Sequence, residues 1–190
     1  MNKKMGFTLL ELLTVVVIIA TLTAIAVPQY RRTIQRAQAT EALMNLRTIF
    51  EAAMRYKAQY SSTPQNLQGL DVGFFDAVPV PGQSNASVIG NFLYEFTDDA
   101  IHASRLDGDM YTREHTYSFR AFYNNPDYGG RGAMICQSFS KKYDSICPAF
   151  GEPSEENPAI YVLDKIEEED DDDEISEPEE EVINKPIRWK

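Results

Sequence analysis

The chain has 190 residues, a formal net charge of −11 and two cysteines. The acidity is local, because residues 167–181 hold 12 of the 29 acidic residues and no Lys or Arg, which leaves 17 acids against 18 bases elsewhere. This length suits one modest domain with additional segments. The near-neutral balance outside residues 167–181 does not indicate a nucleic-acid partner for the chain as a whole.

Residues 7–27 form the first predicted element, an apolar run of 21 residues with one charged side chain, Glu11. As a helix it would be about 32 Å long, enough to cross a hydrocarbon core of about 30 Å. A plain signal anchor and a secretory signal peptide are alternatives. The apolar region of a signal peptide is usually about 7–15 residues long, and a small-residue cleavage site follows it, which this run lacks. A carboxylate at bilayer depth is costly, so Glu11 is a functional hypothesis.

The opening segment resembles a known processing signal. Residues 3–6 (KKMG) followed by residues 7–11 (FTLLE) are similar to the class III signal of the type IV pilin and pseudopilin family. The resemblance implies that prepilin peptidase removes the leader, residues 1–6, by cutting after Gly6, and then N-methylates Phe7. It also implies that Glu11 is the family's assembly acid and that Pro28 is its helix-kinking proline.

The spacing of Phe7 and Glu11 agrees with this resemblance. Residues four apart share a helix face, and a buried carboxylate needs a cationic partner. The amino group of processed Phe7 is the nearest cation, although a pair within one chain is geometrically awkward. In the assembly that the resemblance implies, Glu11 of an incoming subunit pairs with Phe7 of a subunit already docked.

Residues 29–61 predict an amphipathic continuation of the same helix, after a hydrophobic transmembrane or filament-core half at residues 7–28. Pro28 removes one backbone hydrogen bond and should bend the helix. We expect one helix from Phe7 to about Tyr60. The residues that form a single apolar stripe at helical spacing are Ala39, Ala42, Leu43, Leu46, Ile49, Phe50, Ala53, Tyr56 and Tyr60.

A globular head is expected at residues 62–151. Residues 64–90 contain Pro and Gly breakers and predict a connecting loop. Residues 92–97, 101–104, 117–123 and 133–138 alternate apolar and polar side chains, which predicts a meander of antiparallel strands with one face packed. The helix stripe and this one-sided sheet complement each other. The predicted fold class is therefore α+β, a long helix on a small antiparallel sheet.

Cys136 and Cys147 are the only cysteines in the sequence. Outside the cytoplasmic membrane they favour a disulfide, and free buried thiols are the alternative. The resemblance supports the disulfide and implies that the enclosed loop contributes to the filament surface. Residues 140–144 would then form a basic, tyrosine-bearing patch.

Residues 152–190 predict an acidic, flexible C-terminal extension. Residues 160–163 could add one edge strand to the sheet. Residues 167–174 are eight consecutive acids, which repel each other and favour a solvated tail. Weak calcium binding is an alternative, but the run lacks the spacing of a calcium-binding loop. A third possibility is a basic partner such as Arg31, Arg32 and Arg36 of a neighbouring chain.

No catalytic motif is present in the sequence, and His102 and His115 stand alone. We expect no metal site, no cofactor and no enzyme, with a membrane-tethered enzyme as the remaining alternative. The expected function is a structural subunit of a type IV pilus, major or minor. A type II secretion pseudopilin is the second interpretation, and a minor pilin for DNA uptake is the third.

The resemblance also implies partners and a location. The partners would be other pilin subunits, prepilin peptidase, the inner membrane and the pilus assembly platform. Before assembly the chain would cross the bacterial inner membrane once with its N-terminus inside, and afterwards it would lie in an extracytoplasmic filament. The basic residues do not favour this orientation, because Lys3 and Lys4 are outnumbered by Arg31, Arg32 and Arg36. The motif alone predicts the topology.

Overall fold

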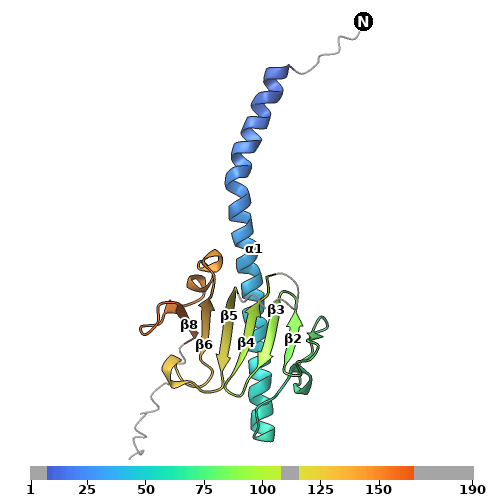
Figure 1. Cartoon of the computed structure of the whole chain (residues 1–190), viewed down its shortest axis with the longest axis vertical. Helices are drawn as coiled ribbons and strands as arrows, with labels where there is room; N and C mark the ends of the chain where they lie inside the picture. The colour runs from blue at the N-terminus through green and yellow to red at the C-terminus, as the bar shows by residue number, and fades with distance from the viewer. Residues whose placement is uncertain (1–7, 108–115, 165–190) are drawn as a thin grey trace, which may run out of the picture.

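The structure is a computed structural model that describes residues 8–107 and 116–164. One helix dominates it: α1, Leu9–Tyr60, has 52 residues and is therefore about 78 Å long. Its C-terminal half lies across one face of a sheet, and its N-terminal half stands clear of the rest of the molecule (Figure 1). The long helix and its end near Tyr60 were both predicted from the sequence and are confirmed.

The sheet has eight antiparallel strands in the order β1-β2-β3-β4-β5-β6-β8-β7. Their bounds are β1 Val78–Pro79, β2 Ala86–Ile89, β3 Phe92–Phe96, β4 Ala100–Arg105, β5 Tyr117–Phe122, β6 Met134–Ser138, β7 Glu152–Pro153 and β8 Ile160–Asp164. A short 3-10 helix at Leu67–Gly69 lies between α1 and β1, and three more lie between the strands, at Pro126–Tyr128, Lys141–Tyr143 and Cys147–Ala149. The predicted α+β class and the four central strands, β3 to β6, are confirmed.

Two corrections extend the sheet beyond its predicted limits. The connecting loop expected at residues 64–90 contains β1 and β2, which pair with each other and, through β2, with β3. The head does not end at residue 151, because β8 pairs with β6 and β7 forms the far edge. Residues 160–163 therefore lie inside the sheet rather than at its edge. Strand pairing in three dimensions, which no local pattern reports, is the reason for both errors.

The main core fills the space between α1 and the sheet. The stripe residues from Ala39 to Ala53 are buried against the α1-facing side chains of β3 to β6. Phe50 stacks on Tyr123 with ring centroids 5.9 Å apart. Tyr94 reaches further, and its hydroxyl donates a hydrogen bond to the Ala42 carbonyl at 3.2 Å. The helix is thereby fixed to the sheet through its C-terminal half.

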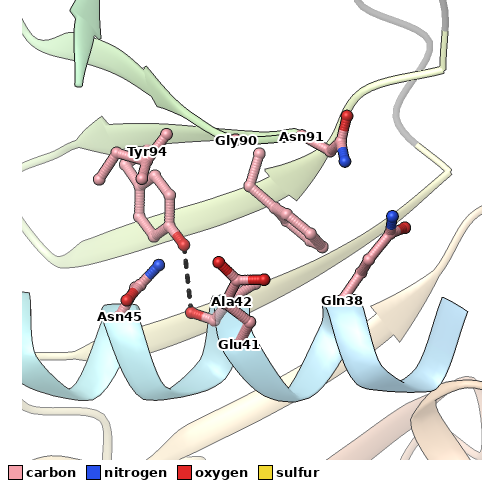
Figure 2. Close-up of a pocket in the computed structure, with 9 residues that line it drawn as sticks. Gln38, Glu41, Ala42, Asn45, Gly90, Asn91 and Tyr94 are labelled. Carbon is pink, nitrogen blue, oxygen red and sulfur yellow. Dashed lines mark hydrogen bonds between the residues drawn. The ribbon is translucent and has the colours of Figure 1, made fainter. Parts of the chain in front are cut away.

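A small cavity of about 40 Å³ remains beside Tyr94, between α1 and the turn that joins β2 to β3. Figure 2 shows Glu41 and Asn45 of α1 facing Tyr94 and the Gly90–Asn91 turn across it. Gly90 has a φ of 55°, which suits a glycine at this tight turn. Burial raises the pKa of Tyr94, so its hydroxyl remains a donor.

The alternation of side chains predicts that the face of the sheet turned away from α1 is polar. In the structure this face is partly apolar. Two small apolar clusters lie on it. The first consists of Val80, Ala86, Val88, Leu93 and Leu106. The second consists of Ala100, Phe122, Ile135, Ile160 and Val162. The first cluster depends on β2, which the sequence analysis placed in a loop, and the second depends on β8, which it offered only as an edge strand.

Candidate functional site

The N-terminal half of α1 is the first candidate site, because its apolar surface has no covering in the described chain. Leu9 is 84 % exposed, Leu22 64 % and Ile25 64 %. Within the described residues, α1 is the one helix long and apolar enough to cross a membrane. A continuous exposed apolar surface of this kind marks a membrane or protein contact.

Thr8 and Thr14 organise the backbone around Glu11. Thr8 is the N-cap of α1, and its side chain accepts a hydrogen bond from the Glu11 N–H at 3.2 Å. Its hydroxyl donates to the Glu11 carboxylate at 3.5 Å, which is a long contact. The Thr14 hydroxyl donates to the Glu11 carbonyl at 2.9 Å. The backbone at Glu11 is therefore well satisfied.

The Glu11 carboxylate, in contrast, has only a weak hydrogen-bond partner in the described residues. Within residues 8–107 and 116–164, no salt bridge reaches it, and the Thr8 hydroxyl is its hydrogen-bond donor. In water the charge is solvated. In a bilayer or an apolar bundle the same charge would need a cation. Gly6 and Phe7, the predicted cleavage and methylation residues, lie outside the described residues.

Hydroxyl groups further along the same half are all turned back onto the helix, which the sequence analysis missed. Thr21 donates to the Ile18 carbonyl at 2.9 Å, and Thr23 donates to the Ile19 carbonyl at 2.7 Å. Threonines within an apolar helical run are the signal that could have predicted this arrangement. The hydrogen-bonding capacity of these hydroxyl groups is thus used within the helix. Glu11 is the one charged side chain on this apolar surface from Leu9 to Val27.

Pro28 lies within α1, and the helix continues through it. Its missing N–H leaves the Ala24 carbonyl without its helical donor. The bend expected at this position stays a prediction.

The second candidate site is the loop closed by a disulfide between Cys136 and Cys147, which was predicted and is confirmed. The two Cα atoms are 5.4 Å apart, and both side chains are fully buried in the main core. The bridge ties the Cys147–Ala149 3-10 helix to β6. The alternative of free thiols is thereby excluded in this structure.

The predicted patch at residues 140–144 needs a correction. Tyr143 is 3 % exposed and belongs to the main core, so it is not a surface tyrosine. Lys142 is engaged with Asp107, with Nζ 3.0 Å from Oδ2, and the Tyr143 hydroxyl donates to the same oxygen at 3.2 Å. Hydrogen bonding from Lys142 lowers the pKa of Asp107. Lys141 is the exposed cation that remains on this loop.

The described residues contain no group of three or more metal-ligating side chains that could hold an ion. His102 lies on β4, where its Nε2 is 3.4 Å from the Thr97 hydroxyl. His115 and the acidic run at residues 167–174 lie outside the described residues, so calcium binding there stays a hypothesis.

Comparison with known proteins agrees with the N-terminal signal. The prokaryotic N-terminal methylation motif matches residues 1–27. Two fimbrial proteins of Pseudomonas aeruginosa are each 37 % identical over 93 residues, which cover 46 % of this chain and 60 % of theirs. A fimbrial protein of Moraxella nonliquefaciens is 44 % identical over 66 residues, covering 35 % of this chain and 38 % of its own. No solved structure matches.

The matched stretch thus spans about 60 % of the first two relatives' length. The apolar N-terminal helix and the methylation motif fit an anchored precursor. With the motif at residues 1–27, the fimbrial relatives and the long helix packed on an antiparallel sheet, the chain is recognised as resembling the type IV pilins.

Proposed function

We propose that the chain is a structural subunit of a type IV pilus, either a major or a minor pilin, and not an enzyme. Prepilin peptidase removes residues 1–6 at the cytoplasmic side of the inner membrane and methylates Phe7. An assembly platform then extracts the subunit from the membrane, and α1 enters the core of an extracytoplasmic filament. The fimbrial relatives and the methylation motif support this proposal.

The exposed apolar half of α1, which carries one charge at Glu11, is the observation on which the proposal depends most. Lipid can cover the apolar surface before assembly, and neighbouring helices can cover it afterwards. The Glu11 carboxylate has no cation among the described residues of its own chain. A second subunit can supply one through the amino group of its processed Phe7, which gives the bundle a defined register.

The same helix would also serve a type II secretion pseudopilin, and we place that function second. The relatives found are fimbrial proteins, which favours the pilus. Electron microscopy of cells with and without this chain separates the two, because a pilin adds surface fibres and a pseudopilin does not. A subunit confined to DNA uptake would leave fibre number unchanged and reduce transformation instead.

Substitution of Glu11 tests the proposed assembly. Glu11→Ala should leave membrane insertion and cleavage after Gly6 intact, and it should reduce the amount of chain recovered in sheared fibres. Immunoblots of the membrane and fibre fractions measure both quantities. Glu51→Ala is the matched control, because Glu51 is an exposed acid on the C-terminal half of α1.

If Glu11→Ala enters fibres at the wild-type level, Glu11 has no role in assembly. If Glu11→Ala and Glu51→Ala reduce assembly equally, the effect is one of general charge rather than of a specific pair. Glu11→Gln refines the result, because the amide keeps the shape of the side chain and loses its charge.

A further inference from the structure

A basic pocket lies at the C-terminal end of α1, on the side of the sheet that the helix covers. Its volume is about 380 Å³, and we define it by Lys57, Tyr123, Asn124 and Arg131, with Met54 and Ala58 completing the wall. None of these lining residues is acidic. The pocket combines elements distant in sequence, namely the last turns of α1 and the connection from β5 to β6.

The two cations in this pocket are available to an anion. The Lys57 ammonium lies 5.3 Å from the centroid of the Tyr123 ring, which holds it at the pocket without neutralising it. In the described part of the chain neither Lys57 nor Arg131 has a carboxylate within salt-bridge distance. This contrasts with Arg55 and Lys142, which pair with Asp71 and Asp107.

The described chain ends two strands away from β5, the strand that leads into this pocket. In the register of the sheet, Asp164 is the backbone partner of Met134, and Met134 is also the partner of Ala121 on β5. Tyr123 lies two residues beyond Ala121, and Arg131 three residues before Met134. Glu167, the first of eight consecutive acids, comes three residues after Asp164. That is a reach of about 10 Å in an extended chain.

The opposite face of the sheet at the same end repels such a segment. A cavity of about 260 Å³ beside Val162 is lined by four carboxylates. They belong to Asp127, Glu152, Glu155 and Glu156. Val162 belongs to the cluster on the face away from α1. The electrostatic field at the end of β8 therefore favours the α1 side for an acidic segment and disfavours the other side.

We propose that the acidic segment at residues 167–181 docks onto the basic pocket of its own chain, with its carboxylates on Lys57 and Arg131. Because Glu167 follows Asp164 by only three positions, this binding is intramolecular, and the effective concentration is high even where each ion pair is weak. In this arrangement the globular head of each chain binds the acidic segment of the same chain. The proposal does not depend on the function proposed above.

The cluster at Arg31, Arg32 and Arg36 is the competing basic surface. These side chains are exposed and precede Ala39, where burial of α1 begins. Arg36 and Lys57 are 21 residues apart on one helix, which is about 31 Å. The end of β8 lies two strands from β5, whose following residue Tyr123 meets Lys57. We therefore expect the tail of the same chain to reach the pocket before it reaches the arginines.

Carbodiimide cross-linking of the full chain in detergent tests the proposal, because this reagent joins amines to carboxylates in direct contact. Peptide mass spectrometry should find Lys57 joined to residues 167–181 in the monomer band. Lys141, an exposed lysine on the disulfide-closed loop, is the internal control. We expect the Lys57 product to exceed the Lys141 product about tenfold at about 0.05 M NaCl and to fall several-fold at about 1 M NaCl.

Variants that keep the reactive amine sharpen the test. Arg131→Ala leaves Lys57 in place and should lower the Lys57 product several-fold. The triple variant Arg31→Ala, Arg32→Ala, Arg36→Ala should leave it unchanged. A Lys57 product no more abundant than that of Lys141, or one found only in cross-linked dimers, overturns docking within one chain. Loss in the triple variant instead assigns the tail to that arginine cluster.

Discussion

Tyr94 on β3 donates its hydroxyl hydrogen bond to the carbonyl of Ala42 in the middle of α1, at 3.2 Å (Figure 2). Both residues are buried in the main core. The bond joins two residues that are 52 positions apart in sequence. It lies in the part of α1 that packs on the sheet, so it fixes the position from which the exposed N-terminal half projects.

Tyr94→Phe should lower the free energy of unfolding of the head by about 1 kcal/mol, the usual net value of one buried hydrogen bond. The cost stays modest because the Ala42 carbonyl keeps its acceptor role within the helix. Urea unfolding in detergent measures the change. Tyr60→Phe, at a 58 % exposed position, is the control and should alter stability little. Equal effects of the two substitutions would contradict a specific role for the Tyr94 bond.

Removal of the disulfide should lower the free energy of unfolding of the head by more than Tyr94→Phe does. The bridge closes a loop with a sequence separation of 11, for which the chain-entropy account gives about 2–3 kcal/mol. The double variant Cys136→Ala, Cys147→Ala should unfold at a correspondingly lower urea concentration. Wild-type protein in reducing agent should behave like the variant, and the variant should not respond to reducing agent. A variant as stable as the oxidised wild type would refute the stabilising role of the bridge.

Substitution of Gly151 tests whether the chain at β7 packs against β8 at the edge of the sheet. A Cβ atom at this position would overlap the backbone carbonyl of Val162 on β8. Gly151→Ala should therefore force β7 and β8 apart and destabilise the head by roughly 1–3 kcal/mol, the usual range for overpacking. Gly73→Ala is the matched control, because a Cβ there meets nothing within 4 Å. If Gly151→Ala is as well tolerated as Gly73→Ala, the edge does not pack as described.

Protonation of Asp107 should make the free energy of unfolding of the head depend on pH in the acid range. Hydrogen bonds from Lys142 first, and then from Tyr143, hold its folded-state pKa below the ordinary value. A lowered folded pKa contributes stability above the unfolded pKa of about 4, and that stability disappears as pH falls through the folded pKa. The stability difference between wild type and Asp107→Asn should therefore shrink as pH falls from about 5 to about 2.

Urea unfolding across this pH range measures the difference, with Asp98→Asn as a control at an exposed aspartate. A difference between wild type and Asp107→Asn that stays constant with pH would show that protonation of Asp107 is not coupled to folding.

Much of the fold could be predicted because its patterns are local. The stripe from Ala39 to Ala53 repeats at helical spacing, and Phe92, Tyr94 and Phe96 alternate cleanly, so α1 and β3 were found. β1 has only two residues, Val78 and Pro79, which is too short for any period. Its existence depends on pairing with β2.

The candidate sites divide in the same way. Thr8 and Thr14 each lie three residues from Glu11, within one helical turn of it, so their hydrogen bonds to its backbone follow from spacing alone. The fate of Tyr143 could not be predicted, since it depends on a disulfide that folds its loop onto the core and on Asp107, 36 positions away. The basic pocket likewise depends on Lys57 meeting Tyr123 across the helix–sheet interface.

Mass spectrometry of the N-terminus tests the central claim most directly. The chain should be purified from cells that carry a prepilin peptidase, and its first residues should be sequenced. The account predicts a product that begins with N-methylated Phe7, lacking residues 1–6. Recovery of a membrane-inserted chain that still carries Gly6, in cells that process their other prepilins, would contradict it.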